Sequence, residues 1–505
     1  MNRTEFVGWL RTVETAYPVA EWRAAGFRTW PMIRVGLYLA SFKPHAGAPT
    51  PAPGAARRMR RVARPALSLL RSYVVDSRAN VRPDAPADAV FLAYSMGGQP
   101  IVAGRRYNPL VAPYVALLAE LGKRSVVWET APGGEFNTPR YTPSAYIQPR
   151  LALAGLRRAP RGSQSAAVVL DGYADFARDA ARRGLSLPHS DAAAVGRDAT
   201  YVRQVADLFK GWLARSGASH AFTADYGLRE QALCLACAEL GVASVDVQHG
   251  MQGDLHPAFG SWFNVPRDGY ELRPRIYWCW DEASAAAVER WAARTDRAFA
   301  VVGGDPWRDA WRSNGAPLVS QSDAEVAAAK AATGGSVHVL VSLDSTGAVI
   351  PPVILEAARR APRSWCFWFR LHPLTVRTRL ESTRRLVRAT GATAADVAYA
   401  SELPLFAILR QVDVHVTATW STVVRDAAAL GVPSVGCTPE ARELFATEVA
   451  HGALRVASSP DELLAAIEEQ RHRRLPTERA APRSRGAMQR VLAGEPARAA
   501  EPVAS

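Results

Sequence analysis

From residue 88 onward, short apolar runs alternate with segments whose apolar residues recur every three to four positions. The short runs are typical of buried strands, and the three-to-four spacing is typical of helices. A chain that alternates the two folds most readily into a parallel sheet covered by helices. The strands expected in the first half span residues 89–95, 124–130, 166–172, 220–225, 243–250, 275–281 and 298–304.

A second series of the same kind follows, with strands expected at residues 338–344, 366–373, 397–400, 412–418 and 433–437. A chain of 505 residues is too long for one ordinary core. We therefore expect an α/β fold with two Rossmann-like domains facing one another across a cleft, preceded by an N-terminal helical extension. The expected boundaries are 1–80 for the extension, 85–303 and 304–475 for the two domains, and 476–505 for a disordered tail rich in Ala, Pro and Arg.

The extension carries two patterns. Residues 1–45 show helical spacing, and a Pro/Ala/Gly linker then leads to residues 57–75, where arginines surround apolar side chains. Such a basic amphipathic helix can lie on an anionic membrane surface, and the same pattern also fits a helix packed on the body of the protein.

The net charge of +14 is carried mostly by arginine, which suits anionic partners or reflects codon usage in a GC-rich genome. The basic residues lack neighbouring aromatic stacking motifs, so we expect no nucleic-acid partner.

The expected location is the cytoplasm, peripheral to the inner membrane at most. Residues 1–25 carry charges and lack the apolar core of a secretory signal, and no apolar stretch reaches the length that spans a bilayer. Cys234 and Cys237 form a C-x-x-C inside a helical stretch without a second ligand pair. Because a structural zinc needs four ligands, we expect core packing there and no metal site.

Polar residues follow several expected strands, and in open α/β sheets ligands bind at the carboxyl ends of strands. His249 ends one strand. Its imidazole suits a general base or a hydrogen-bond donor to a phosphate, or it caps a loop. Asp225 is a catalytic carboxylate or a helix N-cap. We interpret His249 and Asp225 as catalytic, and we expect three further residues to line the cleft: Gln248, Gly250 and Asp171.

The second domain offers an anion site. Hydroxyls and free backbone N–H groups at a helix start suit a phosphate, although the same hydroxyl also suits a plain N-cap. An acid one turn further along the helix lies within reach of a ribose hydroxyl. The candidate donor-binding residues are Arg370, His372, Pro373, Thr419, Ser421, Thr422 and Asp426.

Several signatures are missing from the sequence. There is no G-x-x-x-x-G-K-[ST] loop, which weighs against P-loop ATP hydrolysis. No G-x-G-x-x-G follows the first strand, which weighs against a dinucleotide enzyme, and no G-x-S-x-G marks a hydrolase elbow. No D-x-D is present for a metal-bridged diphosphate.

Five segments together resemble bacterial capsule and lipopolysaccharide glycosyltransferases of the GT-B fold, in particular the β-Kdo transferase group. They are YSMGGQPIVAGRRYNPL (94–110), VQHG (247–250), VVGGDPWRD (301–309), RLHP (370–373) and VTATWSTVVRDAAALGVPSV (416–435). The resemblance covers about residues 88–475 and is carried by the order and spacing of the segments, because each alone is weak.

The resemblance implies a nucleotide-sugar donor held by the C-terminal domain, with His372 facing its phosphate, Ser421 and Thr422 binding it, and Asp426 near the ribose. It implies a glycan or lipid-linked acceptor at the N-terminal domain, beside His249 and Asp225, and chemistry without a metal or another cofactor. This chain departs from the family at two positions. The family usually carries Glu at the ribose position, where this chain has Asp426, and RLHP replaces the commoner Lys- or Arg-Pro-His-Pro patterns. The donor is therefore open between CMP-Kdo and other nucleotide sugars.

The predicted function is therefore glycosyl transfer in surface-polysaccharide synthesis. Three alternatives remain: a nucleotide-sugar epimerase of the same fold, a glycerophosphotransferase, and a non-catalytic partner in polysaccharide assembly.

Overall fold

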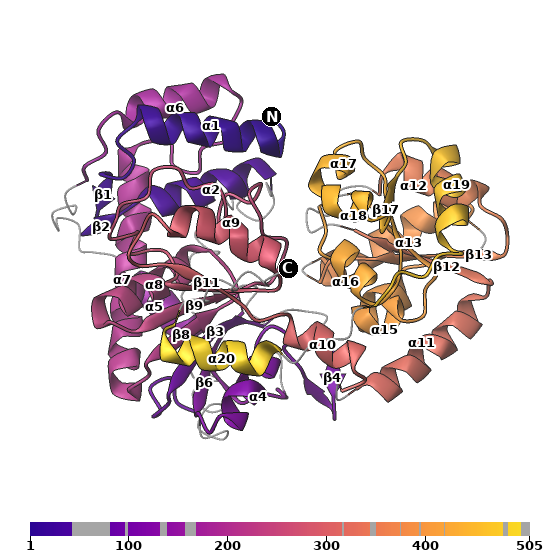
Figure 1. Cartoon of the computed structure of the whole chain (residues 1–505), viewed down its shortest axis with the longest axis horizontal. Coiled ribbons are helices and arrows are strands. Elements are labelled where there is room, and N and C mark those ends of the chain that lie inside the picture. The colour runs from indigo at the N-terminus through magenta and orange to yellow at the C-terminus, as the bar shows by residue number, and fades with distance from the viewer. Residues whose placement is uncertain are drawn as a thin grey trace, which may run out of the picture.

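The computed structural model describes residues 1–42, 81–95, 99–131, 139–156, 168–315, 318–343, 350–373, 375–392, 395–418, 420–477 and 483–495. The basic segment 57–75 and Thr419 lie outside the described residues. Two α/β domains stand side by side and are joined through the short helix α10 (Pro306–Arg312) (Figure 1).

The N-terminal domain contains a seven-stranded parallel sheet in the order β11-β10-β9-β8-β3-β6-β7. The first strand of the sheet, β3, lies in its interior, and the chain winds outward to β7 before it returns to β8. This is the doubly wound order, whose reversal between β3 and β8 is where such sheets bind ligands. The strands are β3 (Ala89–Tyr94), β6 (Ser125–Thr130), β7 (Ser144–Tyr146), β8 (His220–Thr223), β9 (Ala243–Val247), β10 (Ile276–Cys279) and β11 (Phe299–Val302).

Helices cover this sheet, and their ends carry the expected signals. The Asp191 carboxylate accepts a hydrogen bond from the Ala194 N–H at the start of α7, and Gly217 ends that helix in the left-handed conformation. The helices are α4 (Ala112–Glu120), α5 (Gln148–Leu156), α6 (Tyr173–Arg182), α7 (Ala192–Ser216), α8 (Leu228–Leu240) and α9 (Glu282–Ala292), and a short hairpin joins β4 (Ile101–Val102) to β5 (Arg105–Arg106).

The C-terminal domain repeats the pattern with a six-stranded parallel sheet in the order β14-β13-β12-β15-β16-β17. Its reversal lies between β12 and β15. The strands are β12 (Val337–Ser342), β13 (Trp365–Arg370), β14 (Ala395–Asp396), β15 (Val414–Thr417), β16 (Ser434–Gly436) and β17 (Leu454–Val456). The helices are α11 (Val319–Thr333), α12 (Pro352–Arg360), α13 (Val376–Ala389), α14 (Ala398–Glu402), α15 (Leu405–Leu409), α16 (Val423–Ala429), α17 (Ala441–Leu444), α18 (Ala446–Ala450) and α19 (Pro460–Gln470).

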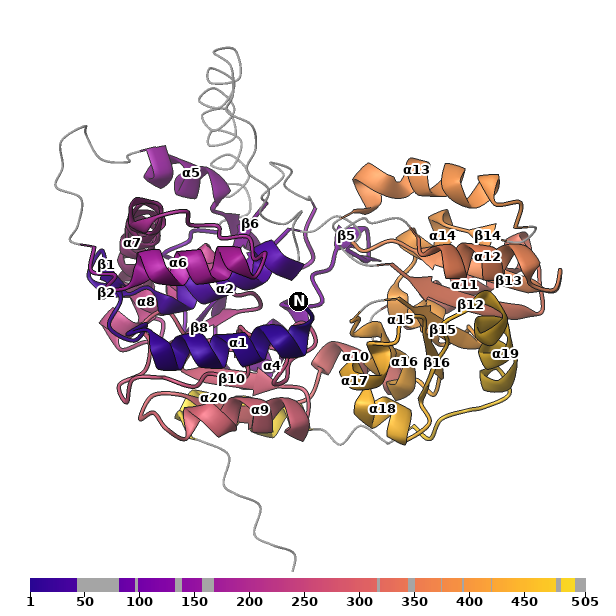
Figure 2. The same cartoon turned by 90° about the horizontal axis from the view of Figure 1, so that it is seen from above.

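Two parallel sheets, each with the doubly wound strand order, confirm the predicted α/β fold of two Rossmann-like domains. The strands at the centre of both sheets are buried along almost their whole length, as in β12, because helices lie on both faces of a parallel sheet. Seen from above, the helices stand around each sheet (Figure 2).

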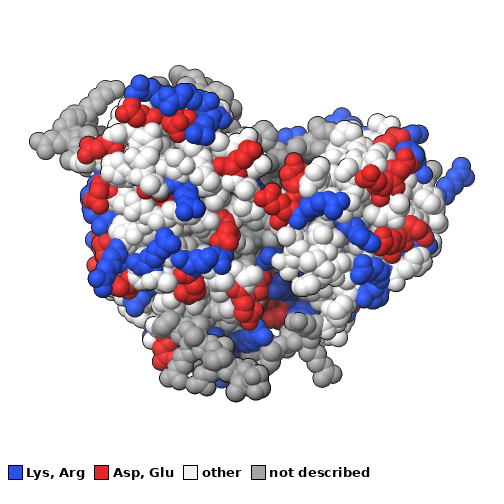
Figure 3. Space-filling model, turned by 45° about the horizontal axis from the view of Figure 1, so that its top comes forward, with Lys and Arg blue, Asp and Glu red and all other residues white. Residues whose placement is uncertain are grey.

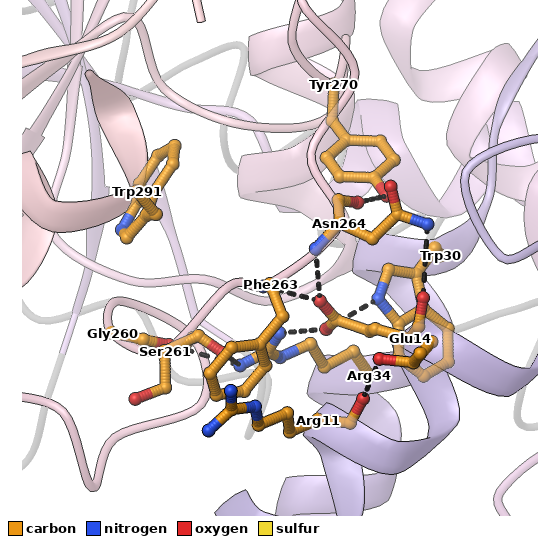
Figure 4. Close-up of polar contacts among 12 residues, drawn as sticks. Arg11, Glu14, Trp30, Arg34, Gly260, Ser261, Phe263, Asn264, Tyr270 and Trp291 are labelled. Carbon is orange, nitrogen blue, oxygen red and sulfur yellow. Dashed lines mark hydrogen bonds and ion pairs between the residues drawn. The ribbon is translucent and has the colours of Figure 1, made fainter. Parts of the chain in front are cut away.

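The first two helices, α1 (Arg3–Ala16) and α2 (Trp30–Phe42), pack on the N-terminal domain, with the short strands β1 (Arg23–Ala24) and β2 (Phe27–Arg28) between them. Phe6 and Trp30 are fully buried in the same apolar cluster as strands of the large sheet. The Glu14 carboxylate forms a buried ion pair with Arg34 (Figure 4).

That carboxylate also accepts hydrogen bonds from the backbone N–H groups of Phe263, at 2.7 Å, and Asn264, at 2.9 Å. The helices α1 and α2 therefore pack on the body of the protein, whereas the basic segment 57–75, for which two roles were open, lies outside the described residues.

Two expected strands are wrong. In 166–172, the described residues from 168 on lie outside the large sheet, and Val169 forms only an isolated antiparallel bridge with Arg23. In 397–400, helix α14 begins instead, and the Asp396 carboxylate accepts a hydrogen bond from the Ala400 N–H at 2.8 Å. In both places apolar residues such as Leu170 and Val397 pack against the core beside a sheet without joining its strands, and a short apolar run does not reveal this difference.

A helix also stands where the sequence predicted a disordered tail. In α20 (Arg483–Ala493), the side chains of Ala487, Met488 and Val491 are fully buried in a cluster with strands of the N-terminal domain. The Ser484 hydroxyl donates to the Gly303 carbonyl at 2.7 Å. The chain thus returns from the C-terminal domain to the N-terminal one, because three apolar residues at helical spacing find a partner there.

Candidate functional site

The two domains meet between the loop after β9 and the start of α16. Met251 of that loop is buried in one apolar cluster with Val424 and Phe445. The ring of His256 lies 5.9 Å, centroid to centroid, from the ring of Trp420. The surface is hollowed between the two domains (Figure 3). We call this region, bounded by the loops after β8 and β9 and the loops after β13 and β15, the interdomain cleft.

Asp225 lies after β8 on the N-terminal side of the cleft and is half-buried. Its carboxylate accepts a hydrogen bond from the Tyr226 N–H at 2.7 Å. The N-cap of α8 is Gly227, without a side-chain hydrogen bond, so Asp225 is not the helix cap that its position also allowed. Its carboxylate is thus available at the reversal point of the sheet.

His249 follows β9, the strand next to β8, and is also half-buried. Its ring lies 5.7 Å from the ring of Tyr226 and 6.3 Å from that of Phe259, centroid to centroid. A Cβ at Gly250 would meet no atom of the described residues within 4 Å. The glycine therefore leaves space beside the imidazole.

Gln248 does not line the cleft as expected. It is 1% exposed, and its side-chain carbonyl accepts from the Trp280 N–H at 2.7 Å, while its amide donates to the Gly250 carbonyl and to the Ser284 hydroxyl. It fixes the end of β9 against α9. Asp171 is also displaced from the cleft, because its segment lies with β1, and its carbonyl accepts from the Trp22 indole at 2.8 Å.

Two acids on this side were missed by the sequence analysis. Glu230 in the first turn of α8 is 2% exposed, and Asp246 on β9 is 1% exposed. Burial, with the nearby charge of Asp225, raises the pKa of Glu230 to about 7. Burial likewise raises the pKa of Asp246. The available signal was an acid inside an otherwise apolar strand, which is rarely placed there without a role.

On the C-terminal side, Ser421 and Thr422 follow β15 and are half-buried. The Ser421 hydroxyl accepts a hydrogen bond from the Val423 N–H at 3.2 Å, and Thr422 is the N-cap of α16 without a side-chain hydrogen bond. His372 and Pro373 follow β13, one strand away from β15 across β12, and are half-buried. These four residues share the carboxyl edge of the sheet.

Arg370 has another role than the expected one. Its guanidinium donates to the carbonyls of Ala400, at 2.6 Å, and Leu403, at 2.7 Å. Burial lowers its pKa to about 10. Arg370 therefore ties β13 to the end of α14 through its Nη1.

Asp426 also differs from its expected place near a ribose. It is 6% exposed, and its carboxylate lies 3.7 Å from the guanidinium of Arg308 on α10. Burial raises its pKa to about 7 despite this cation. Asp426 thus packs α16 against the helix that joins the domains.

Charged contacts hold α16 and the loop before it against the N-terminal domain. The Arg425 guanidinium lies 3.1 Å from the carboxylate of Asp281, the N-cap of α9, and 3.1 Å from that of Glu448. The Arg3 guanidinium carbon lies 4.2 Å from the ring centroid of Trp420, within cation–π range. The candidate phosphate loop is therefore fixed from both sides.

In the described part of the chain, no group of three or more His, Cys, Asp or Glu side chains is placed to hold a metal ion. Cys234 and Cys237 are buried, as expected for core packing. Across the described helices, none is long and apolar enough to cross a membrane.

No known family model and no curated protein matches this chain. Among solved structures, it is similar to the UDP-GlcNAc 2-epimerase of Methanocaldococcus jannaschii, with 12% identity, 80% of this chain and 99% of that chain covered, and a TM-score of 0.47.

It is also similar to the UDP-GlcNAc 2-epimerase of Neisseria meningitidis bound to UDP-GlcNAc, with 12% identity, 81% and 100% covered, and a TM-score of 0.47. A third is the wall teichoic acid polymerase TagF, with 10% identity, 87% and 98% covered, and a TM-score of 0.40. With TM-scores this low, the assignment of the fold rests on the strand order of the two sheets.

Proposed function

We propose that the protein is a metal-independent glycosyltransferase of the GT-B type. It moves a sugar from a nucleotide-sugar donor to a glycan or lipid-linked acceptor in bacterial surface-polysaccharide synthesis. One observation carries the proposal: the loop after β9, which contains His249, contacts the segment after β15, which contains Ser421, through Met251 and His256. A candidate base and a candidate phosphate site therefore face the same cleft.

The donor phosphate binds at the carboxyl edge of the C-terminal sheet. The Ser421 and Thr422 hydroxyls at the start of α16 supply hydrogen bonds to an anion, and the imidazole of His372 supplies another. As the nucleotide leaves, negative charge grows on its phosphate, and these fixed donors stabilise that charge. Support for this part comes from the half-buried position of these residues at one sheet edge.

The acceptor binds against the N-terminal domain. Asp225 takes the proton of the acceptor hydroxyl as its oxygen bonds to the sugar carbon, while the bond from that carbon to the donor phosphate breaks. His249, on the neighbouring strand, assists by hydrogen bonding to the acceptor. Two observations support this part. The Asp225 carboxylate does not cap α8, and a Cβ at Gly250 would meet no atom of the described residues within 4 Å.

CMP-Kdo is the first donor to test, because the sequence resembles β-Kdo transferases. UDP-, GDP- and dTDP-sugars are the other donors to test. Cytoplasmic donors and a lipid-linked acceptor place the reaction at the inner face of a membrane, where residues 57–75 would bind anionic lipid.

The test is product analysis with the full chain. Each nucleotide sugar is incubated with and without a lipid-linked oligosaccharide fraction, and nucleotide release and sugar incorporation are measured by mass spectrometry. Incorporation that depends on acceptor, and that Asp225→Asn reduces at least about a hundredfold, supports the proposal. Conversion of the donor alone to an epimer, or transfer of phosphate into the product, contradicts it.

A further inference from the structure

A small cavity with both polar and apolar lining residues lies beside Asp225 inside the N-terminal domain. Its volume is about 20 Å³, enough to hold about one water molecule. The polar residues that line it come from the loop after β8, α8, β9, β10 and the loop before β10, and they include Asp225, Glu230, Gln231, Asp246, Arg273 and Tyr277.

Five of these residues place a buried polar atom where no described residue is a hydrogen-bond partner. The atoms are Glu230 Oε2, Gln231 Oε1, Asp246 Oδ1, Arg273 Nε and Nη2, and Tyr277 Oη. Each of the five residues is at most 7% exposed. Because nearly all buried polar atoms find a partner, such a set around one cavity is suited to hydrogen-bond ordered water.

The charges around the cavity do not balance. Asp225, Glu230 and Asp246 are three carboxyls, and Arg273 is the cation that lines the cavity with them. Full ionisation would leave uncompensated negative charge away from solvent, which is costly. The cavity therefore retains a proton near neutral pH, as the pKa of about 7 for Glu230 indicates.

The groups that interact with these acids come from several elements. Glu230 interacts with Asp225, with Arg229 on its own helix and with Tyr94 at the end of β3. Asp246 interacts with Arg273, Asp225, Gln252 and Glu230. Further titratable groups at or beside the cavity are Tyr226, Cys234 and Tyr277.

We propose that Glu230 and Asp246 form a proton relay behind Asp225. This inference rests on the proposed function. The acceptor hydroxyl gives its proton to the Asp225 carboxylate as the glycosidic bond forms, and the electron pair of the breaking bond leaves with the donor phosphate. Water in the cavity then carries that proton from Asp225 to the ionised Glu230 or Asp246, which restores Asp225 as a base. After product release the proton returns by the same route to solvent.

The relay is tested by the pH dependence of kcat in the wild type, Glu230→Gln and Asp246→Asn. The expected wild-type profile contains an ionisation near pH 7. Each amide variant is expected to lose that ionisation and to show kcat about tenfold lower, with donor KM and directly titrated donor affinity unchanged. Glu356→Gln, an acid on α12 whose side chain is 40% exposed, is the matched control and keeps the wild-type profile.

The outcomes separate the two proposals. If the wild-type protein neither binds nor turns over any donor, the proposed function itself is contradicted. Normal wild-type turnover with an unchanged kcat and pH profile in both amide variants overturns the relay alone. Should a variant fail to fold, infrared spectroscopy of the wild type decides: a protonated carboxyl band that titrates near pH 7 supports the relay, and its absence at pH 6 overturns it.

Discussion

The guanidinium of Arg3 lies against the ring of Trp420, with 4.2 Å between its central carbon and the ring centroid. This contact joins the first helix of the chain to the residue beside Ser421. The same guanidinium donates to the Tyr38 hydroxyl at 3.3 Å, so α1 and α2 together hold the loop after β15. The N-terminal helices thus take part in closing the interdomain cleft.

Arg3→Ala is expected to raise the donor KM by about twofold to thirtyfold, because a cation–π contact contributes about 0.5–2 kcal/mol. The chemical step should keep its rate, since Arg3 contacts the loop and not the reacting atoms. Steady-state kinetics at several donor concentrations measures both constants. Arg3→Lys, which keeps the charge, should recover part of the affinity, and an unchanged KM in Arg3→Ala would refute the role.

Glu14 and Arg34 form a buried ion pair that anchors the helical extension. Replacing Glu14 by Ala leaves the Arg34 charge buried without its partner, so the free energy of unfolding should fall by about 3–5 kcal/mol. Urea denaturation followed by circular dichroism measures the change. Thr12→Ala on the exposed side of the same helix should stay within about 0.5 kcal/mol. Equal stability of the two variants would show that the extension is not anchored here.

Met488 in α20 is fully buried against the N-terminal domain. Met488→Ala removes most of a buried side chain, and we expect a loss of about 2–5 kcal/mol in the free energy of unfolding. The matched control is Arg485→Ala, whose exposed ion pair with Glu120 contributes about 0–1 kcal/mol. A tail that is disordered, as the composition predicted, would give the same unfolding curve for both variants.

Asp426 makes the stability depend on pH in a defined direction. Its pKa is about 7 in the folded protein, against 3.8 ordinarily. Between these values the folded state binds a proton that the unfolded state has lost, so the free energy of unfolding falls as the pH rises from about 4 to 7. At about 1.4 kcal/mol per pKa unit, the fall reaches roughly 4 kcal/mol.

Asp426→Asn should therefore show a weaker decline of stability between pH 5 and pH 8, measured by urea denaturation at both values. Because Asp426 faces Arg308 and not the cleft, nucleotide affinity should remain. An unchanged pH dependence together with lost nucleotide affinity would show instead that Asp426 binds the ribose, as the sequence predicted.

Local pattern predicted the two-domain architecture because the strands of the two sheets are short, mostly apolar runs between turn residues, as in β12 and β13. It failed where apolar residues pack against a distant part of the chain without joining its sheet. The run ending at Leu170 lies with β1, and Met488 is covered by a domain more than 150 residues earlier in the chain.

The positions of polar residues at strand ends were predictable, but their contacts were not. Asp225 and Gln248 both follow strands of one sheet, yet the first is available at the cleft and the second bonds inward to Trp280 and Ser284. Side-chain direction depends on the neighbours that a fold supplies, which no spacing encodes. For the same reason Arg370 was assigned to a phosphate although two carbonyls of the α14 region bind it.

The most direct test of the central claim is calorimetric titration of the full chain with CMP-, UDP-, GDP- and dTDP-sugars, using Ser421→Ala, Ser421→Thr and the exposed control Ser382→Ala. We predict that one nucleotide class binds the wild type and Ser382→Ala alike, that Ser421→Ala weakens this binding about tenfold, as expected for a hydrogen bond to a charged group, and that Ser421→Thr restores it. Failure of every nucleotide sugar to bind the wild type, or equal binding by Ser421→Ala, would contradict a nucleotide-sugar site at the start of α16.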